Sequence, residues 1–294
     1  MGKIIFALVA LGAAIISLGV ASRWSQLGVL NSIDTLMSFS SPTQQVARDV
    51  AYGPLPRQKL DIWAPTAKAT KPRDVVIFFY GGSWNSGERA LYAFAGRALA
   101  ERGYVVVIPD YRLVPDVRFP GFVEDGAAAV AWVHAHAADY GGNPARIHLT
   151  GHSAGAHIAA LLSLDPEWLA KAGAPKDSIK SFAGLAGPYD FVPFTSDASK
   201  AAFGHLPDPT PTQPISYARA GAPPMLLATG TIDETVKPRN SRVLAEALRK
   251  KGAKAATLLY PKLGHSGIIM ALARPFRGFA PVIDDLSAFF DGVR

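Results

Sequence analysis

The stretch Gly-His-Ser-Ala-Gly at 151–155 stands between an apolar run at 146–150 and a run of helical period at 154–164. A sharp turn from strand to helix strains the backbone of its central residue. Glycines two positions to either side are needed there, because a Cβ would clash as strand and helix close on each other. Such an elbow presents the hydroxyl of Ser153 at the amino end of a helix. The alternative is a serine N-cap in a glycine-rich turn. The flanking runs favour a nucleophilic serine.

Six short apolar runs without polar alternation predict a buried parallel sheet. They lie at 75–80, 104–109, 146–150, 181–186, 224–229 and 256–260. Stretches of helical period lie between or after them, at 90–102, 121–138, 154–164, 240–251 and 282–290. Strands alternating with helices of this length imply right-handed crossovers and a doubly wound sheet with helices on both faces. We therefore expect functional residues at the carboxyl ends of the strands.

Two segments depart from this alternation. Short alternating runs at 48–52 and 59–63, separated by glycine and proline, predict an antiparallel hairpin at the start of the domain. The interval 187–222 is rich in proline and has no clear period, which indicates a short lid-like excursion over the site. The predicted fold class is α/β, mostly parallel, with an antiparallel N-terminal hairpin.

The first residues of the chain indicate a leader. Lys3 precedes an unbroken apolar stretch at 4–21, which predicts a secretory signal or a membrane anchor. The stretch is long for a signal peptide and its cleavage site is weak, so an uncleaved anchor in the cell envelope is favoured over a secreted or periplasmic form. The predicted division of the chain is a leader at 1–22, a connector at 23–46 and a catalytic domain at 47–294.

Composition excludes several classes of protein and site. The chain has 294 residues, of which 49% are hydrophobic and 18% charged, too apolar for a disordered protein. The net charge of +7 comes from scattered residues, so nucleic acid is not expected as a partner, although a basic surface suits anionic lipid headgroups. There is no cysteine, and the histidines lack metal-ligand spacing. We expect no metal and no cofactor.

A glycine pair after the run at 75–80 can complete the site. It lies in Tyr-Gly-Gly-Ser-Trp at 80–84, where glycines let backbone N–H groups approach a ligand closely. By the usual pattern of such elbows, the N–H groups of Gly82, Ser83 and Ala154 would form an oxyanion hole. The alternative is a turn without a chemical role.

Among the seven histidines, His265 is the candidate general base. It follows the last predicted strand in a glycine-flanked loop, which is the chain order that this kind of site requires. The other histidines fall within helical runs, within the excursion, or beside the nucleophile, where they cannot easily turn back on it: His134, His136, His157, His205, His148 and His152.

The acid that orients the base is expected on the loop after the run at 224–229. Asp233 is favoured because its short side chain, with a valine three residues later, fits the common form of this loop. Glu234 and Asp190 remain alternatives, as does a purely loop-capping role for Asp233.

Several motifs together resemble a known family. They are Tyr80-Gly81-Gly82-Ser83-Trp84, Asp110-Tyr111-Arg112, Asp125, Asn143-Pro144-Ala145-Arg146-Ile147, the stretch 151–157, and Asp233 with His265. From Asp49 to the C-terminus the chain resembles bacterial carboxylesterases of the α/β-hydrolase superfamily, akin to the hormone-sensitive-lipase group. The arylformamidase and feruloyl-esterase-like (BD-FAE) branch is nearest. One departure is Tyr80, where that family usually has a histidine supporting the oxyanion loop.

The resemblance implies a serine carboxylesterase that works through an acyl-enzyme on a small-molecule ester. Arylformamidase or peptidase chemistry is an alternative, because the same triad cleaves esters and amides. A membrane-tethered, inactive binding module is the alternative outside enzymes. Aromatic residues of the excursion predict an apolar pocket for short to medium acyl groups: Phe191, Phe194, Phe203 and Tyr217.

Overall fold

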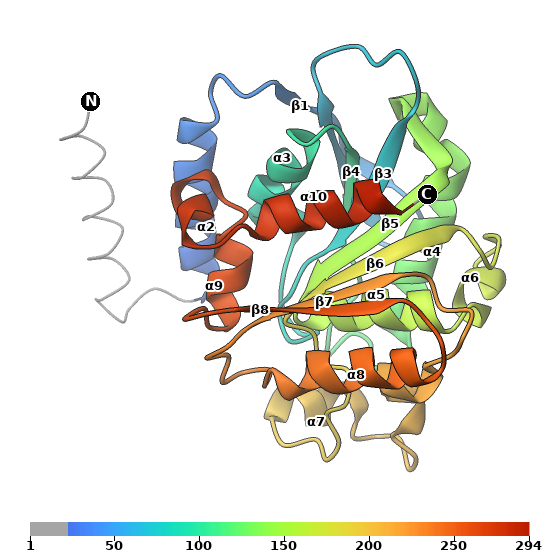
Figure 1. Ribbon diagram of the computed structural model, residues 1–294. Coiled ribbons are helices and arrows are strands. Elements are labelled where there is room, and N and C mark those ends of the chain that lie inside the picture. The colour runs from blue at the N-terminus through green and yellow to red at the C-terminus, as the bar shows by residue number, and fades with distance from the viewer. Residues whose placement is uncertain (1–22, 294) are drawn as a thin grey trace.

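The computed structural model describes residues 23–293, which fold around one eight-stranded sheet (Figure 1). The leader predicted at 1–22 lies outside the described residues. Within 23–293, no helix combines the length and the apolar character that crossing a membrane requires.

The strand order is β1-β2-β4-β3-β5-β6-β7-β8. Pairing is antiparallel between β1 and β2 and between β2 and β4, and parallel from β4 to β8. This confirms both the parallel sheet and the N-terminal hairpin. The strands are β1 (Thr43–Ala51), β2 (Lys59–Pro65), β3 (Arg73–Phe79), β4 (Val105–Pro109), β5 (Gly142–His152), β6 (Ile179–Leu185), β7 (Met225–Gly230) and β8 (Ala255–Tyr260).

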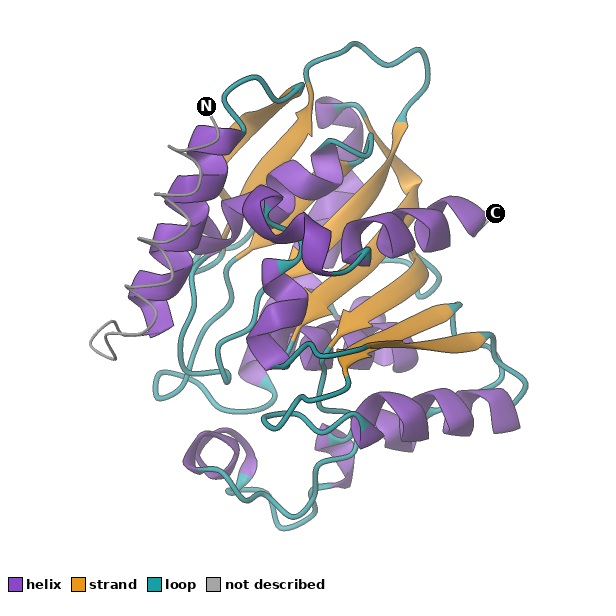
Figure 2. Ribbon diagram, turned by 60° about the vertical axis from the view of Figure 1, so that its left-hand side comes forward, coloured by secondary structure: helices purple, strands orange, loops and turns teal. Residues whose placement is uncertain are grey.

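Helices cover both faces of the sheet (Figure 2). On one face α3 (Ala93–Ala100) packs on α10 (Val282–Gly292), and on the other α4 (Gly121–His136) packs on α5 (Ala154–Leu164). Every residue of α5 is buried, because the helix lies between the sheet, α4 and the excursion. The remaining predicted helix is α8 (Arg239–Lys250), and α6 (Glu167–Lys171) was not predicted.

The segment 23–46 is not the connector that we expected. Residues 23–37 form helix α2 (Arg23–Met37), and β1 already begins at Thr43, four residues before the predicted start of the domain. Helix α2 buries Leu30 and Asp34 against α3 and the C-terminal region. The prediction failed because the helix packs on the domain with polar as well as apolar side chains. Its apolar residues therefore do not recur with the period of a helix.

The excursion at 187–222 is a short structured loop. It contains α7 (Asp197–Phe203) and two 3₁₀ turns, of which one spans Thr210–Thr212. Phe191 and Phe194 are half-buried, whereas Phe203 is fully buried. Tyr217 is half-buried as well, so Phe191, Phe194 and Tyr217 keep some exposed ring surface and Phe203 does not.

Candidate active site

The predicted elbow joins β5 to α5. Ser153 lies between them with φ 55° and ψ −122°, a conformation that costs energy in a residue with a side chain. A Cβ on Gly155 would lie 2.1 Å from the carbonyl oxygen of Phe79, and one on Gly151 would lie 2.7 Å from the carbonyl carbon of Gly155. The Ser153 N–H donates to the Leu185 carbonyl at 2.9 Å, which ties the elbow to the carboxyl end of β6.

The structure brings the predicted nucleophile, base and acid into one hydrogen-bonded chain. Nε2 of His265 is 2.9 Å from the Ser153 Oγ, and its Nδ1 is 2.8 Å from the Asp233 Oδ2. All three residues are buried, with 8% of Ser153 exposed. The sequence predicted a loop around His265, but this residue is the first of helix α9 (His265–Met270). This arrangement can remove a proton from the serine hydroxyl.

The three candidate acids occupy different surroundings. The N–H groups of Thr235 and Val236 donate to the Asp233 Oδ1 at 3.0 and 2.8 Å, which leaves Oδ2 for the imidazole. Glu234 forms an exposed ion pair with a lysine, and Asp190 pairs with an arginine. Of these three carboxylates, only Asp233 is hydrogen-bonded to His265 within residues 23–293.

The predicted oxyanion loop lies against the nucleophile. A Cβ on Gly81 would lie 3.1 Å from the Cβ of Ser153. Gly82, Ser83 and Trp84 all have positive φ, of 144°, 54° and 59°. In the described part of the chain, the N–H groups of Gly82, Ser83 and Ala154 donate to no other residue. Together with the amino end of α5, such N–H groups can bind a negatively charged oxygen.

Tyr80 is the first residue of the predicted oxyanion loop and fixes it to the interior of the domain. Its ring is fully buried and stacks on those of Tyr92 and Tyr111 at 5.4 and 4.8 Å. Its hydroxyl donates to the Asp110 Oδ1 at 2.8 Å and accepts from the Arg57 Nη2 at 2.9 Å. Burial and the Asp110 charge raise the pKa of Tyr80 well above its usual value, so the hydroxyl stays protonated. The hydroxyl can therefore support the loop as a donor.

Two histidines set aside by the sequence analysis contact the site. Nε2–H of His152 donates to the backbone carbonyl of His265 at 3.0 Å and so ties the elbow to the predicted base. His157 bonds to Trp84 and Thr212 from the next turn of α5. Both stand in the motif at 151–157, but their partners are distant in sequence, and no local pattern indicated them. No cluster of three or more metal-ligating side chains occurs within residues 23–293.

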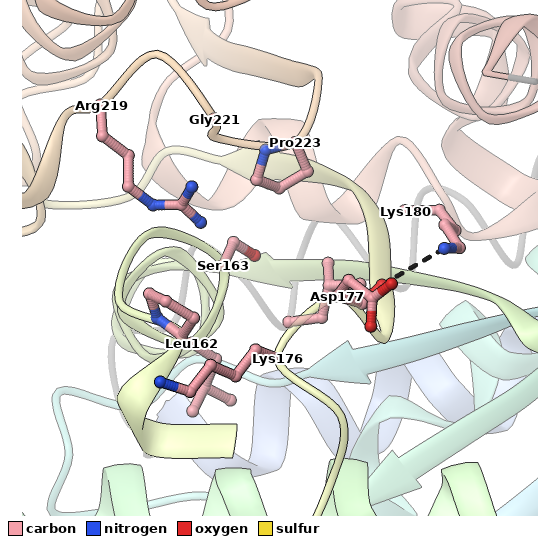
Figure 3. A pocket seen from close by; sticks show the side chains of 10 residues that line it. Leu162, Ser163, Lys176, Asp177, Lys180, Arg219, Gly221 and Pro223 are labelled. Carbon is pink, nitrogen blue, oxygen red and sulfur yellow. Dashed lines mark hydrogen bonds between the residues drawn. The ribbon is translucent and has the colours of Figure 1, made fainter. Parts of the chain in front are cut away.

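A separate cavity of about 360 Å³ lies at the amino end of β6, and Figure 3 shows its lining residues. Its walls include Ile179 at the start of β6, whereas the elbow contacts the end of that strand. Arg219, Lys176 and Lys180 border the cavity, and Lys180 donates to the Asp177 carbonyl at 3.3 Å. None of the six predicted site residues lines it.

Comparison with known proteins identifies the family. The BD-FAE family model matches residues 60–248. A probable isoprenylcysteine alpha-carbonyl methylesterase of Arabidopsis thaliana is 32% identical over 264 residues, 82% of this chain and 54% of the relative. Esterase LipC of Mycobacterium tuberculosis is 32% identical over 246 residues, 77% of this chain and 61% of the relative. The chain thus spans between about half and two thirds of the length of these relatives.

The fold is also that of a solved esterase. Esterase B from Lactobacillus rhamnosis, solved as an inhibited form, superimposes with a TM-score of 0.77 at 21% identity, covering 98% of this chain and 96% of that one. At this identity the likeness shows the fold. The chain belongs to the BD-FAE family and has the α/β-hydrolase fold.

Proposed function

We propose that the protein is a serine carboxylesterase whose catalytic triad is Ser153, His265 and Asp233. The observation that carries the proposal is the continuous chain of hydrogen bonds from the Asp233 carboxylate through His265 to the serine hydroxyl. The strained elbow supports it, since such a conformation persists only where the surrounding structure imposes it.

In the proposed cycle, the Ser153 Oγ attacks the ester carbonyl while Nε2 of His265 takes the hydroxyl proton. The Asp233 carboxylate stabilises the imidazolium of His265 by accepting a hydrogen bond from its Nδ1–H. The N–H groups of Gly82, Ser83 and Ala154 bind the oxyanion. The imidazolium then gives its proton to the leaving alcohol, which departs as the acyl-enzyme forms. Water then attacks the acyl carbon while the same Nε2 takes its proton. The bond from the acyl carbon to the Ser153 Oγ breaks, the imidazolium returns the proton to Oγ, and the carboxylic acid leaves.

The proposed substrates are small esters with short to medium acyl groups. Phe191 stacks on Trp84 with ring centroids 5.9 Å apart, beside the proposed oxyanion donor Ser83. These rings favour a neutral, apolar acyl group. The names of the relatives, a methylesterase and an esterase, favour ester over amide chemistry.

A fluorophosphonate probe tests the nucleophile directly. The full-length protein should be labelled in proportion to its concentration, and Ser153→Ala should not be labelled. Ser266→Ala is the matched control, because Ser266 is an exposed serine next to the base and should label like wild type. Labelling of Ser153→Ala at the wild-type rate would contradict the proposal. Lack of labelling in the wild type would favour the inactive binding module.

We further propose that the apolar stretch at 4–21 keeps the protein in the cell envelope as an uncleaved anchor. Protein with its native N-terminus should then stay with the membrane fraction through a carbonate wash. Recovery of a soluble form that begins at Ser22 would instead identify a cleaved signal peptide, and would leave the proposed chemistry untouched.

A further inference from the structure

His157 uses both nitrogens of its ring. The residue is fully buried in α5, and its N–H donates to the Ser153 carbonyl at 3.1 Å, one turn from the elbow. Nε2 is 2.7 Å from the carbonyl oxygen of Thr212, and Nδ1 is 3.3 Å from Nε1 of Trp84. A carbonyl can only accept and an indole N–H can only donate. The ring is therefore neutral, with its proton on Nε2.

The contact with Trp84 reaches the oxyanion loop. Ser83 and Trp84 have left-handed backbone conformations, which side-chain-bearing residues keep only when their surroundings hold them. The Trp84 carbonyl accepts from the Val114 N–H at 2.9 Å, and its indole ring packs edge to face with the ring of Phe203, with centroids 4.7 Å apart. The bond from Nε1 to His157 is the polar contact of this side chain with the helix that carries the nucleophile.

The contact with Thr212 reaches the excursion. Gln213 donates from Nε2 to the Thr212 Oγ1 at 2.7 Å, and its Oε1 accepts from the Phe191 N–H at 2.8 Å. Phe191 in turn stacks on Trp84. These contacts form a ring of residues that runs from His157 through Thr212, Gln213, Phe191 and Trp84 back to His157. The ring connects helix α5, the predicted oxyanion loop and the excursion.

We propose that His157 is a positioning residue: it fixes Trp84, and through Trp84 the oxyanion N–H of Ser83, relative to Ser153. The inference rests on the proposed function. The ring lies among aromatic side chains, edge-on to Trp84 and Phe191, and burial lowers its pKa to about 4. Its acceptor nitrogen therefore stays available to Trp84 at neutral pH.

Two conservative variants separate the two bonds. His157→Asn places an acceptor near the position of Nδ1 and lacks the donor to Thr212. His157→Gln places a donor near Nε2 and lacks the acceptor for Trp84. A small misplacement of catalytic groups costs up to about 100-fold in rate. We expect His157→Gln to lower kcat by about 10- to 100-fold with KM changed less than about threefold. His157→Asn should recover kcat by about tenfold relative to His157→Gln.

Two further variants complete the test. Trp84→Phe keeps a ring but loses the donor, and should lower kcat as His157→Gln does. His205→Gln is the matched control, because His205 also anchors the excursion, to the Phe119 carbonyl at 3.1 Å, without touching Trp84. It should leave kcat unchanged. Concentrations of active sites are set by fluorophosphonate titration, so that loss of folded protein does not count as loss of kcat.

The indole N–H resonance of Trp84, assigned with Trp84→Phe, reports the contact without any activity. It should move upfield in His157→Gln and less in His157→Asn. Wild-type kcat in both His157→Gln and Trp84→Phe would overturn the positioning role, even if both melt at lower temperature. Absence of esterase activity in the wild type, with the expected resonance shifts, would overturn the proposed function and leave the contact established.

Discussion

Arg97 of α3 and Asp34 of α2 form a buried ion pair, with Nη2 and Oδ2 2.8 Å apart and the two side chains 8% and 1% exposed. The other Asp34 oxygen accepts from the N–H of Arg274 at 2.7 Å. Arg97 also donates to the Asn31 side chain and lies over the ring of Trp63. Helix α2 is therefore fastened to both the N-terminal and the C-terminal parts of the domain.

Removing one partner of this pair should destabilise the whole domain. Asp34→Ala leaves the Arg97 charge buried without its carboxylate, which costs about 3–5 kcal/mol in unfolding free energy. Urea denaturation of the full-length protein measures the loss. Glu246→Ala is the control, since its pair with Lys250 is exposed to solvent and contributes little to the unfolding free energy. Equal losses in the two variants would show that α2 is only loosely attached.

The orientation of the base gives a second prediction. Asp233→Asn should lower kcat/KM for p-nitrophenyl acetate by about 10³-fold or more, because an amide cannot stabilise the imidazolium or hold its tautomer. Asp190→Asn should keep nearly all activity, since Asp190 pairs with Arg239 and does not contact His265. If Asp190→Asn is the damaging change, the acid is misassigned.

The sheet and the proposed triad could be predicted because their signals are local. A strand buried on both faces is an apolar run, and an elbow is a serine between glycines at a strand-to-helix switch. Helix α2 was missed because Asn31 and Asp34 face inward, and their partner Arg97 is more than 60 residues away. His157 was set aside for the same reason, because its role depends on Trp84 and Thr212.

Acid should weaken the fold through His157. Its pKa of about 4 in the folded protein lies below the usual value of 6.5. Above pH 6.5 the imidazole is neutral in both states. Below pH 6.5 the imidazole binds a proton in the unfolded chain but not in the folded protein. The unfolding free energy therefore falls as the pH is lowered, until about pH 4. At about 1.4 kcal/mol for each pKa unit, the full loss is about 3 kcal/mol.

His157→Asn removes this titration. Between pH 7 and pH 4.5, its unfolding free energy should fall by about 2–3 kcal/mol less than that of the wild type. Carboxylates such as Asp74 and Glu101 titrate in both proteins and cancel in the comparison. Burial raises the pKa of each, but hydrogen bonds outweigh it and lower the pKa, from Arg146 to Asp74 and from Ser41 and two arginines to Glu101. Parallel pH profiles for the two proteins would contradict the assignment of a neutral, buried His157.

Tyr80 supplies a test of the loop support that the family usually builds with histidine. Tyr80→Phe keeps the stacking on Tyr92 and Tyr111 but removes the donor to Asp110. We expect a loss of about 1–3 kcal/mol in unfolding free energy, because a buried carboxylate loses a hydrogen bond. Asp110 keeps its partner Arg89, so kcat should fall less than about tenfold. A loss as large as that of Asp233→Asn would show that the hydroxyl takes part in the reaction.

The excursion gives a prediction about the length of the acyl group that the proposed active site accepts. Phe191, Phe194 and Tyr217 are half-buried rings of the excursion, and Phe203 is already packed in the interior. Each acyl CH₂ that reaches such a surface gains about 0.8 kcal/mol until the surface is covered. A short loop with a single two-turn helix has little room for a long acyl tunnel. We therefore expect kcat/KM for p-nitrophenyl esters to rise from acetyl to butyryl or hexanoyl and to fall for palmitoyl.

Phe191→Ala should flatten this rise, because it removes a half-buried ring that stacks on Trp84 of the predicted oxyanion loop. Tyr217→Phe is the matched control, since the Tyr217 hydroxyl donates to the Pro211 carbonyl within the excursion and the ring remains.

N-formylkynurenine belongs in the same panel, because the triad that cleaves esters also cleaves amides. If this formamide exceeds every ester by about tenfold, or if palmitoyl is the best acyl group, the substrate class is wrong while the triad stands. The gain from acetyl to butyryl, two CH₂ groups, should be about 15-fold at most, since about 1.4 kcal/mol changes a rate constant tenfold.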